Sequence, residues 1–289
     1  MERNNSLLKV ITALFLIVGT TGFVFPQNAA FFNNKNYLKT LYKDSAYMNL
    51  KKKVVSDFVH SQPGHWGEFV KGVDEDIRTS KKYIAFTFDA CGGPKRNGYD
   101  AQLINFLKKE NIPATLFITG KWIDANFNTF LALSQDTLFE IENHGLNHQP
   151  CSIDGESEYG IHGTSNAAQA FDEIEANARK IEAITHHRPR YYRSATAFID
   201  EAGARLARKL GITAVSFQVL SGDAVPFTPV SVIEESVVKN VRPGAIVIMH
   251  FNHPEWNTYE AMQKIVPKLR EMGYHFVKLE HFQLISEKQ

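Results

Sequence analysis

Short runs of β-branched and aromatic residues alternate along this chain with longer stretches in which apolar residues recur at helical spacing. The short runs have the composition of buried strands, and the longer stretches that of amphipathic helices. Repeated strand–helix units predict an α/β fold around a parallel sheet. The predicted strands are residues 83–89, 114–119, 139–143, 190–194, 213–218, 245–250 and 274–278. The predicted helices are residues 99–110, 122–134, 166–184, 199–210, 229–240 and 257–272, with a long loop at 149–163.

Polar residues with chemically active side chains stand at or just beyond the ends of these strands. They are, in chain order, Asp89, His144, His148, Arg193, Asp223 and His250. If the strand–helix units close into a barrel, the C-terminal ends of its strands form one rim, where such barrels assemble active sites. The pattern therefore predicts that residues far apart in the sequence converge in one pocket.

In this order and spacing, the strand-end residues resemble the motifs of the polysaccharide deacetylases of carbohydrate esterase family four, over residues 80–280. Members of this family use a metal ion to remove N-acetyl groups from chitin-like sugars and from peptidoglycan. The resemblance implies a distorted (β/α) barrel of about seven parallel strands with its active site at the C-terminal rim. The segments that carry it are "TFDACGG" with Asp89, "HGLNH" with His144 and His148, "RSATA" with Arg193, "GDA" with Asp223 and "IVIMH" with His250.

The family's chemistry assigns an expected role to each matching residue. Hydrolysis of an amide needs an activated water and an acid for the departing amine. His144 and His148, four residues apart, would bind one divalent ion, expected to be zinc, if the segment turns helically after its strand. Asp89 would be the general base.

The other matching residues would support the base and supply the acid. Arg193 would orient Asp89 and keep it ionised. His250 would be the general acid, held cationic by Asp223. A backbone N–H near Thr196 would help to stabilise the oxyanion.

The sequence leaves the third metal ligand open. Ala90 stands where most family members have a metal-binding aspartate, and the third motif keeps only its arginine. Asp89 is one replacement, as ligand, base or both. Glu142 is another, because it alternates to the same strand face as His144. A water-rich site held by two histidines is the third.

The only two cysteines of the chain, Cys91 and Cys151, both lie close to metal-site motifs. In an oxidising compartment they are expected to form a disulfide that ties the first motif to the histidine loop. A thiolate ligand to zinc is one alternative, and two buried free thiols are the other.

Further residues are expected to contact the substrate. The loop 156–164 follows the metal motif and would lie over the pocket, where Tyr159 offers a flat ring for a sugar. Asn252 and His253 follow the last motif and are expected at the rim, together with the backbone near Thr196.

Composition fits this interpretation. With 289 residues, 44% of them hydrophobic, the chain is long enough for one large domain and a short extension. Its net charge of +1 provides no general attraction to nucleic acid, whereas a neutral glycan partner requires none.

The N-terminus has the pattern of an export signal. Arg3 and Lys9 precede an uncharged apolar stretch over residues 10–25, so residues 1–30 are predicted to be a signal peptide or an uncleaved signal anchor. The protein is expected to be periplasmic, extracellular or anchored to the outer face of the membrane. Residues 31–80 would form an N-terminal extension and residues 81–289 the catalytic domain.

Two other functions fit parts of the pattern. Ala90 and the altered third motif favour a catalytically silent glycan-binding protein on the same fold. A metal-free amidase acting on a small amide is the other alternative, although the intact histidine motif argues against both. A glycosidase is disfavoured because no paired carboxylates stand at strand ends.

Overall fold

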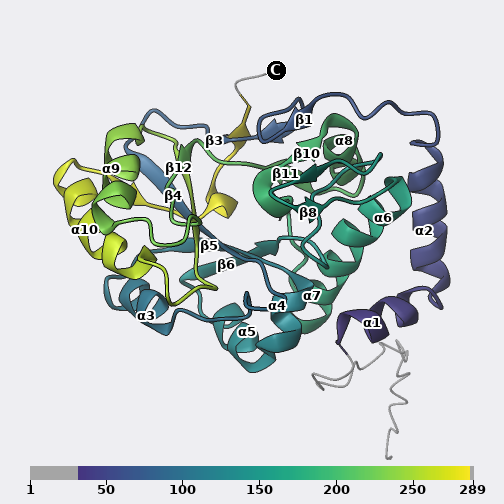
Figure 1. Cartoon of the computed structure of the whole chain (residues 1–289), viewed down its shortest axis with the longest axis horizontal. Coiled ribbons are helices and arrows are strands. Elements are labelled where there is room, and N and C mark those ends of the chain that lie inside the picture. Colours follow the sequence, from purple (N-terminus) through teal and green to yellow (C-terminus); the bar gives the residue numbers. More distant parts are fainter. Residues whose placement is uncertain (1–31, 287–289) are drawn as a thin grey trace, which may run out of the picture.

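The computed structural model describes residues 32–286 and is built around one curved sheet, in which all the strand pairs are parallel (Figure 1). The strand order is β12-β13-β4-β5-β6-β9-β11-β2, with β14 also paired to β4. The strands of this sheet are β2 (Val73–Asp74), β4 (Tyr83–Ala90), β5 (Ala114–Ile118), β6 (Phe139–Asn143), β9 (Tyr191–Tyr192), β11 (Thr213–Val215), β12 (Val219–Leu220), β13 (Ile246–His250) and β14 (His275–Phe276).

The predicted distorted barrel is confirmed, as a half-barrel that stays open between β12 and β2. All seven predicted strands are present. The sheet has nine because it also contains the two-residue strands β2 and β12, which the sequence patterns did not predict.

Helices lie outside the sheet, and the first two of them pack on other helices rather than on the sheet itself (Figure 1). They are α1 (Asn34–Leu41), α2 (Ser45–Ser56), α3 (Ala101–Lys109), α4 (Gly120–Ala125), α5 (Phe127–Ser134), α6 (Ala167–Phe171), α7 (Asn177–Thr185), α8 (Glu201–Lys209), α9 (Val230–Asn240) and α10 (Thr258–Glu271). Two predicted helices are interrupted. The 122–134 helix breaks at Asn126, and a π-helical turn, Asp172–Ala176, joins α6 to α7.

Three short antiparallel pairs complete the fold. They are β1 (Trp66–Gly67) with β10 (Ile199–Asp200), β3 (Asp76–Ile77) with β15 (Leu284–Ile285), and β7 (Ser157–Glu158) with β8 (Ile161–His162). The last pair forms a hairpin inside the predicted long loop. Its turn is made by Tyr159 and Gly160, which both have positive φ, as two-residue hairpin turns require.

Side-chain alternation brings two of the predicted catalytic residues together. On β4, Phe86 and Phe88 pack outward under the helices, whereas Ala85 packs in the inner core. Asp89 follows Ala85 by four positions and therefore lies on the same inner face. Ile248 of β13 also packs in the inner core. His250 follows it by two positions and therefore lies on the inner face as well. Because His250 is the register partner of Asp89, the two side chains stand next to each other at the strand ends.

The part of the predicted N-terminal extension that the structure describes packs closely on the barrel. Asn34, in α1, donates its side-chain amide to the carbonyl of Leu146 at 2.6 Å. Strand β2 joins the main sheet beside β11, so the predicted boundary at residue 80 falls within the barrel. The predicted signal, residues 1–30, lies outside the described residues. Within residues 32–286, no helix has both the length and the apolar character needed to cross a membrane.

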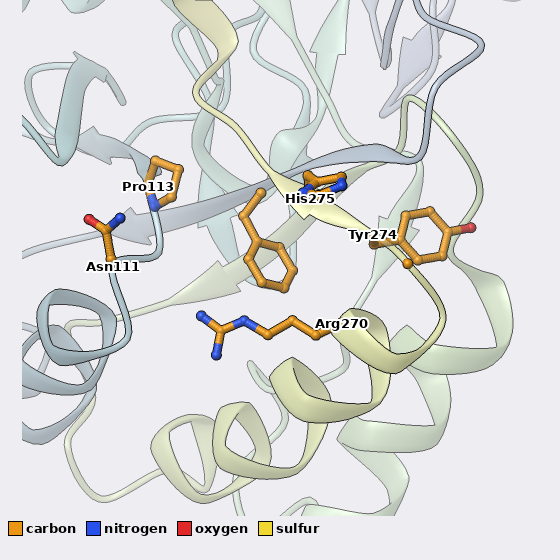
Figure 2. Close-up of a pocket in the computed structure, with 7 residues that line it drawn as sticks. Asn111, Pro113, Arg270, Tyr274 and His275 are labelled. Atoms are coloured by element: carbon orange, nitrogen blue, oxygen red, sulfur yellow. The ribbon is translucent and has the colours of Figure 1, made fainter.

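A surface hollow lies at the opposite end of the sheet from the predicted catalytic residues. Figure 2 shows it between the end of α10 and the segments that lead into β5 and β14, with Pro113 and His275 in its wall. Arg270 of this hollow donates to the side chain and the carbonyl of Glu110. Because it lies at the opposite end of the strands, the hollow is separate from the predicted catalytic site.

Candidate active site

A buried ion pair at the end of β4 fixes the predicted base. Arg193 donates from Nη1 to Asp89 Oδ1 at 2.8 Å and from Nη2 to the carbonyl of Ser216 at 2.8 Å. Its guanidinium also lies over the ring of Phe117, 4.2 Å from the centroid. Both charged residues are almost fully buried, so removing either would leave an unpaired charge inside the protein. The predicted contact between Arg193 and Asp89 is present.

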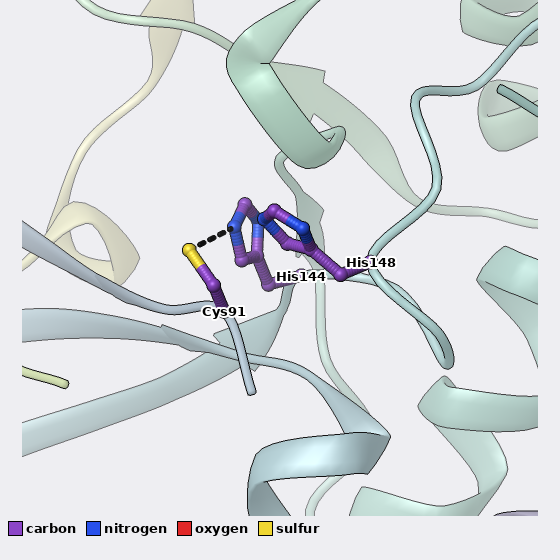
Figure 3. Close-up of side chains that lie close together, drawn as sticks. All are labelled: Cys91, His144 and His148. Atoms are coloured by element: carbon purple, nitrogen blue, oxygen red, sulfur yellow. Dashed lines mark hydrogen bonds between the residues drawn. The ribbon is translucent and has the colours of Figure 1, made fainter. Parts of the chain in front are cut away.

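Three potential metal donors gather beside this ion pair. Figure 3 shows Cys91, directly after β4, pointing toward the rings of His144 and His148. One donor atom from each residue lies within 4.8 Å of the others, and Cys91 Sγ is 3.9 Å from His144 Nε2. A tetrahedral zinc ion with ordinary bond lengths would place sulfur and nitrogen about 3.5 Å apart. These three donor atoms could therefore bind one metal ion if they moved slightly closer together.

A hydrogen bond at one ring nitrogen of His144 leaves the other ring nitrogen available to bind a metal ion. Its Nδ1 lies 2.8 Å from the carbonyl of Arg193, so we assign the proton to Nδ1 and the free lone pair to Nε2. Burial opposes the charged ring, but Asp89, Cys91 and the Arg193 carbonyl together outweigh burial and raise the pKa of His144. A metal ion bound at Nε2 would therefore displace a proton from this ring. Burial lowers the pKa of His148 and so favours its neutral, ligand-competent form.

The third donor, Cys91, also has a shifted pKa. Burial opposes ionisation of the thiol, but the surrounding imidazoles, His148 first among them, outweigh burial and hold its pKa well below the usual value.

The segment between the two histidines does not form the helical turn that was thought necessary for both rings to reach one ion. Residues 144–148 form an irregular loop in which Gly145 and His148 both have positive φ. Glu173, in the π-helical turn, fixes this loop by accepting the backbone N–H of Asn147 at 2.9 Å and that of Gln149 at 3.0 Å. A side chain at Gly145 would collide with the Glu173 carboxylate. The histidine spacing is thus imposed by a distant carboxylate that the sequence pattern did not identify.

This contact predicts a metal-binding defect remote from the ligands. Replacing Glu173 with glutamine puts an amide N–H toward loop donors and should lower metal affinity roughly tenfold to 100-fold, the range for residues that support ligands. Competition with a chelator would measure the change. Glu175→Gln is the matched control, since Glu175 is equally buried in the same turn but pairs with Arg179 and Arg188. Equal affinities in both variants would contradict the anchoring role.

The predicted acid, His250, is held by Asp223 as expected. Asp223 Oδ2 accepts the backbone N–H of His250 at 2.7 Å, and Oδ1 lies 3.1 Å from His250 Nδ1. Ser221 and Thr258 donate to the same carboxylate at 2.8 and 3.0 Å. Burial disfavours the imidazolium, but the charge and hydrogen bond of Asp223, together with Cys91, outweigh burial and raise the pKa of His250 well above its usual value. The pair therefore favours a protonated His250.

Trp256 is a neighbour of His250 that the sequence patterns did not single out. Its ring stacks on His253, with centroids 3.8 Å apart, and meets the His250 ring nearly at right angles at 5.6 Å. The aromatic residue six positions beyond a strand end was the only available signal. Trp256 restricts the directions in which the His250 ring can turn.

The predicted disulfide between Cys91 and Cys151 is absent: both cysteines are free and buried. Their side chains have different surroundings. Cys91 faces His144, whereas Cys151 packs against α8, where a side chain at Gly203 would meet its sulfur. The expectation of a bond relied on closeness to the motifs and could not include side-chain direction.

Neither carboxylate considered as a third ligand joins the donor group. Glu142 accepts the backbone N–H groups of Arg190 and Tyr191 at 2.9 and 2.8 Å, and is therefore committed to the start of β9. Asp89 Oδ2 lies 3.7 Å from His144 Nε2, but Asp89 is not among the residues whose donor atoms are all within reach of one another.

The predicted substrate contacts occupy different settings. Tyr159 is 72% exposed at the tip of the β7–β8 hairpin, next to the ring of Phe198. Thr196 is half-buried in a left-handed turn shortly after Arg193, a backbone conformation that non-glycine residues adopt mainly where the surroundings impose it. Asn252 is buried and donates to the carbonyl of Arg96 at 3.0 Å, so it supports the rim from within.

Comparison with known proteins gives one family. Residues 76–215 match the model described as polysaccharide deacetylase. A peptidoglycan-N-acetylglucosamine deacetylase from Bacillus cereus is 25% identical over 204 residues, covering 70% of this chain and 88% of that protein. An uncharacterised Bacillus subtilis protein, YlxY, is 22% identical over 240 residues, which cover 83% of this chain and 66% of that protein. This chain thus spans just under two thirds of that relative's length.

A comparison with solved structures finds a protein with a similar fold. The crystal structure of a pseudoenzyme of the CE4 family from Bacillus anthracis aligns with a TM-score of 0.61 at 24% identity, covering 72% of this chain and 67% of that one. The matched segment contains Asp89, both histidines of the donor group and Arg193, while Asp223 and His250 follow it on the same barrel. This chain therefore carries a domain of the polysaccharide deacetylase family.

Proposed function

We propose that this protein is a metal-dependent hydrolase that removes N-acetyl groups from an exported glycan, either peptidoglycan or a chitin-like oligosaccharide. The observation that carries the proposal is the meeting of two charge pairs, Asp89–Arg193 and His250–Asp223, beside one group of metal donors. The B. cereus relative named as a peptidoglycan deacetylase supports the substrate class. Export through residues 1–30 is part of the same proposal.

The metal centre would include His144 and His148. A bound divalent ion supplies a water of lowered pKa and polarises the substrate carbonyl. We infer zinc, because imidazole nitrogens suit it and catalytic zinc commonly has three protein ligands and one open position.

The protein's own residues then move the protons. Asp89 accepts a proton from the attacking water through Oδ2, while Arg193 holds Oδ1 and keeps the carboxylate in place. His250, whose Nδ1 is directed at Asp223, donates from Nε2 to the departing amine. Base and acid thus have partners of opposite charge: Arg193 holds the Asp89 carboxylate in place, and Asp223 favours a protonated His250. The backbone at Thr196 would face the oxyanion.

Tyr159 would bind a sugar of the glycan chain. Its exposed ring, together with Phe198 and Trp66, forms an aromatic cluster whose adjacent ring centroids are 5.9 and 5.8 Å apart. The cluster joins three segments that are distant in the sequence. Phe198 lies two residues after the left-handed Thr196 and five residues after Arg193. The aromatic cluster therefore lies on the Arg193 side of the site.

Removal of this ring is expected to weaken binding without affecting chemistry. Tyr159→Ala should raise KM for a long glycan by roughly two- to 12-fold, from a stacking contribution of about 0.5–1.5 kcal/mol, and leave kcat unchanged. Tyr159→Phe keeps the flat ring and should behave as the unaltered protein. Steady-state kinetics on oligomers of increasing length would test this. An equal loss of kcat in the alanine variant would place Tyr159 in a different role.

The function itself is tested by acetate release. Purified zinc-loaded protein should release acetate from peptidoglycan fragments or N-acetylchitooligosaccharides, and the released sugar should carry a free amine detectable by mass spectrometry. Chelation should abolish the reaction. The silent glycan-binding alternative has the Ala90 substitution in its favour. Glycan binding without acetate release from either substrate would support that alternative and overturn the enzyme. Acetate release that chelators leave unaffected would favour a metal-free amidase.

A further inference from the structure

Position 90, where most members of this family have a metal-binding aspartate, cannot provide a metal ligand in this chain. Position 90 is an alanine, buried in the apolar cluster between sheet and helices and hydrogen-bonded through its carbonyl to the N–H of Thr119. Its methyl group offers no donor atom. A deacetylase of this kind therefore needs its third protein ligand from elsewhere in the sequence.

The backbone just after β4 holds Cys91 at the donor group from both sides. Thr119 donates its hydroxyl to the carbonyl of Cys91 at 2.8 Å. Gly92 follows with φ of +69°, and a side chain there would collide with the backbone of Trp122. The backbone can therefore make this turn only with glycine at position 92. The turn directs Cys91 Sγ toward His144, where it lies 3.9 Å from Nε2 (Figure 3).

We propose that Cys91 is the third protein ligand, as a thiolate that replaces the carboxylate missing at position 90. This inference rests on the proposed metal-dependent function and specifies its centre. One anionic and two neutral donors preserve the net charge of an aspartate–two-histidine site. Three protein ligands also leave one coordination position for water or substrate.

A sulfur ligand changes which metals the site selects. Thiolates favour soft and borderline ions such as zinc, whereas carboxylates also suit manganese and magnesium. The centre should therefore bind zinc or cadmium in preference to manganese. Asp89, released from ligation, remains with Arg193 and is available as a base.

Cobalt substitution tests the ligand directly, without relying on activity. The full chain loaded with Co²⁺ should show a near-ultraviolet sulfur-to-cobalt charge-transfer band, which nitrogen and oxygen ligands do not produce. Cys151→Ser is the matched control, since Cys151 is the other buried cysteine and packs against α8; it should keep the band. Cys91→Ser should lose the band and bind metal at least about tenfold more weakly, because even changes to supporting residues have that effect.

Cys91→Asp provides a second variant that keeps an anionic donor at the site. It should bind cobalt without the band and shift preference toward manganese. A cobalt-loaded chain that lacks the band, or a Cys91→Ser variant that retains it, would overturn the thiolate ligand. These results are distinguishable from failure of the proposed function: acetate release without the band rejects only the ligand, and the band without acetate release rejects only the enzyme.

Discussion

Replacing His148 with alanine is expected to remove both the metal ion and the activity while the barrel stays folded. His148 is one of three residues whose donor atoms lie within 4.8 Å of one another, so two remain after its loss. Metal ions supply several kcal/mol of transition-state stabilisation, and each 1.36 kcal/mol corresponds to a factor of ten. Acetate release should therefore fall by at least about 10²–10³-fold.

Elemental analysis and turnover measurements on the same preparation would check this result. His187→Ala serves as the control, because His187 is an exposed histidine that lies outside the donor group. Circular dichroism should give the same spectrum for both variants. Stoichiometric metal in His148→Ala would remove His148 from the centre.

His250→Ala is expected to reduce turnover by roughly 10²–10⁴-fold, the usual range for loss of a positioned proton donor, with metal content unchanged. The companion variant Asp223→Asn tests how the acid is tuned. The carboxylate of Asp223 raises the pKa of His250, and the acid must be protonated to act. The basic limb of the pH dependence of kcat/KM reports that ionisation, so Asp223→Asn should move this limb to lower pH.

The pH experiment also separates tuning from simple damage. Asp223 binds the backbone N–H of His250 through its other oxygen, and an asparagine can keep that bond. A basic limb that stays in place in Asp223→Asn, at an unchanged plateau, would contradict the tuning of His250 by Asp223. In contrast, a lower plateau with an unmoved limb would indicate only a structural role for Asp223.

Strand positions and the facing of their side chains follow from the sequence because they depend on local periodicity. Seven runs of apolar residues predicted seven strands, and all seven are present. Alternation within β4 and β13 sets Asp89 and His250 on the same inner face. The convergence of Asp89, Arg193, Asp223 and His250 follows directly from parallel strands that end at one edge.

Loop conformation depends on contacts between distant residues and could not be inferred in the same way. Glu173 holds the histidine loop from a helix more than twenty positions away, and the left-handed backbone of His148 has no local sequence signal. From their spacing alone, the two histidines were expected to share one ion if the segment between them turned helically. The real spacing of the two rings is set by hydrogen bonds that only the folded chain makes.

The cysteines show the same division. Their proximity to two motifs predicted that both would lie near the site, and the expectation of an oxidising compartment favoured a bond between them. Side-chain direction decided otherwise, because the turn at Gly92 aims Cys91 at the histidines while Cys151 packs under α8.

By itself, the sequence determined the succession of strands and helices along the chain, because this depends on local periodicity. The family resemblance implied the barrel and the pairing of Asp89 with Arg193 and of His250 with Asp223. Only the tertiary structure decided which donors can share one ion, because that depends on loops fixed by contacts across the fold.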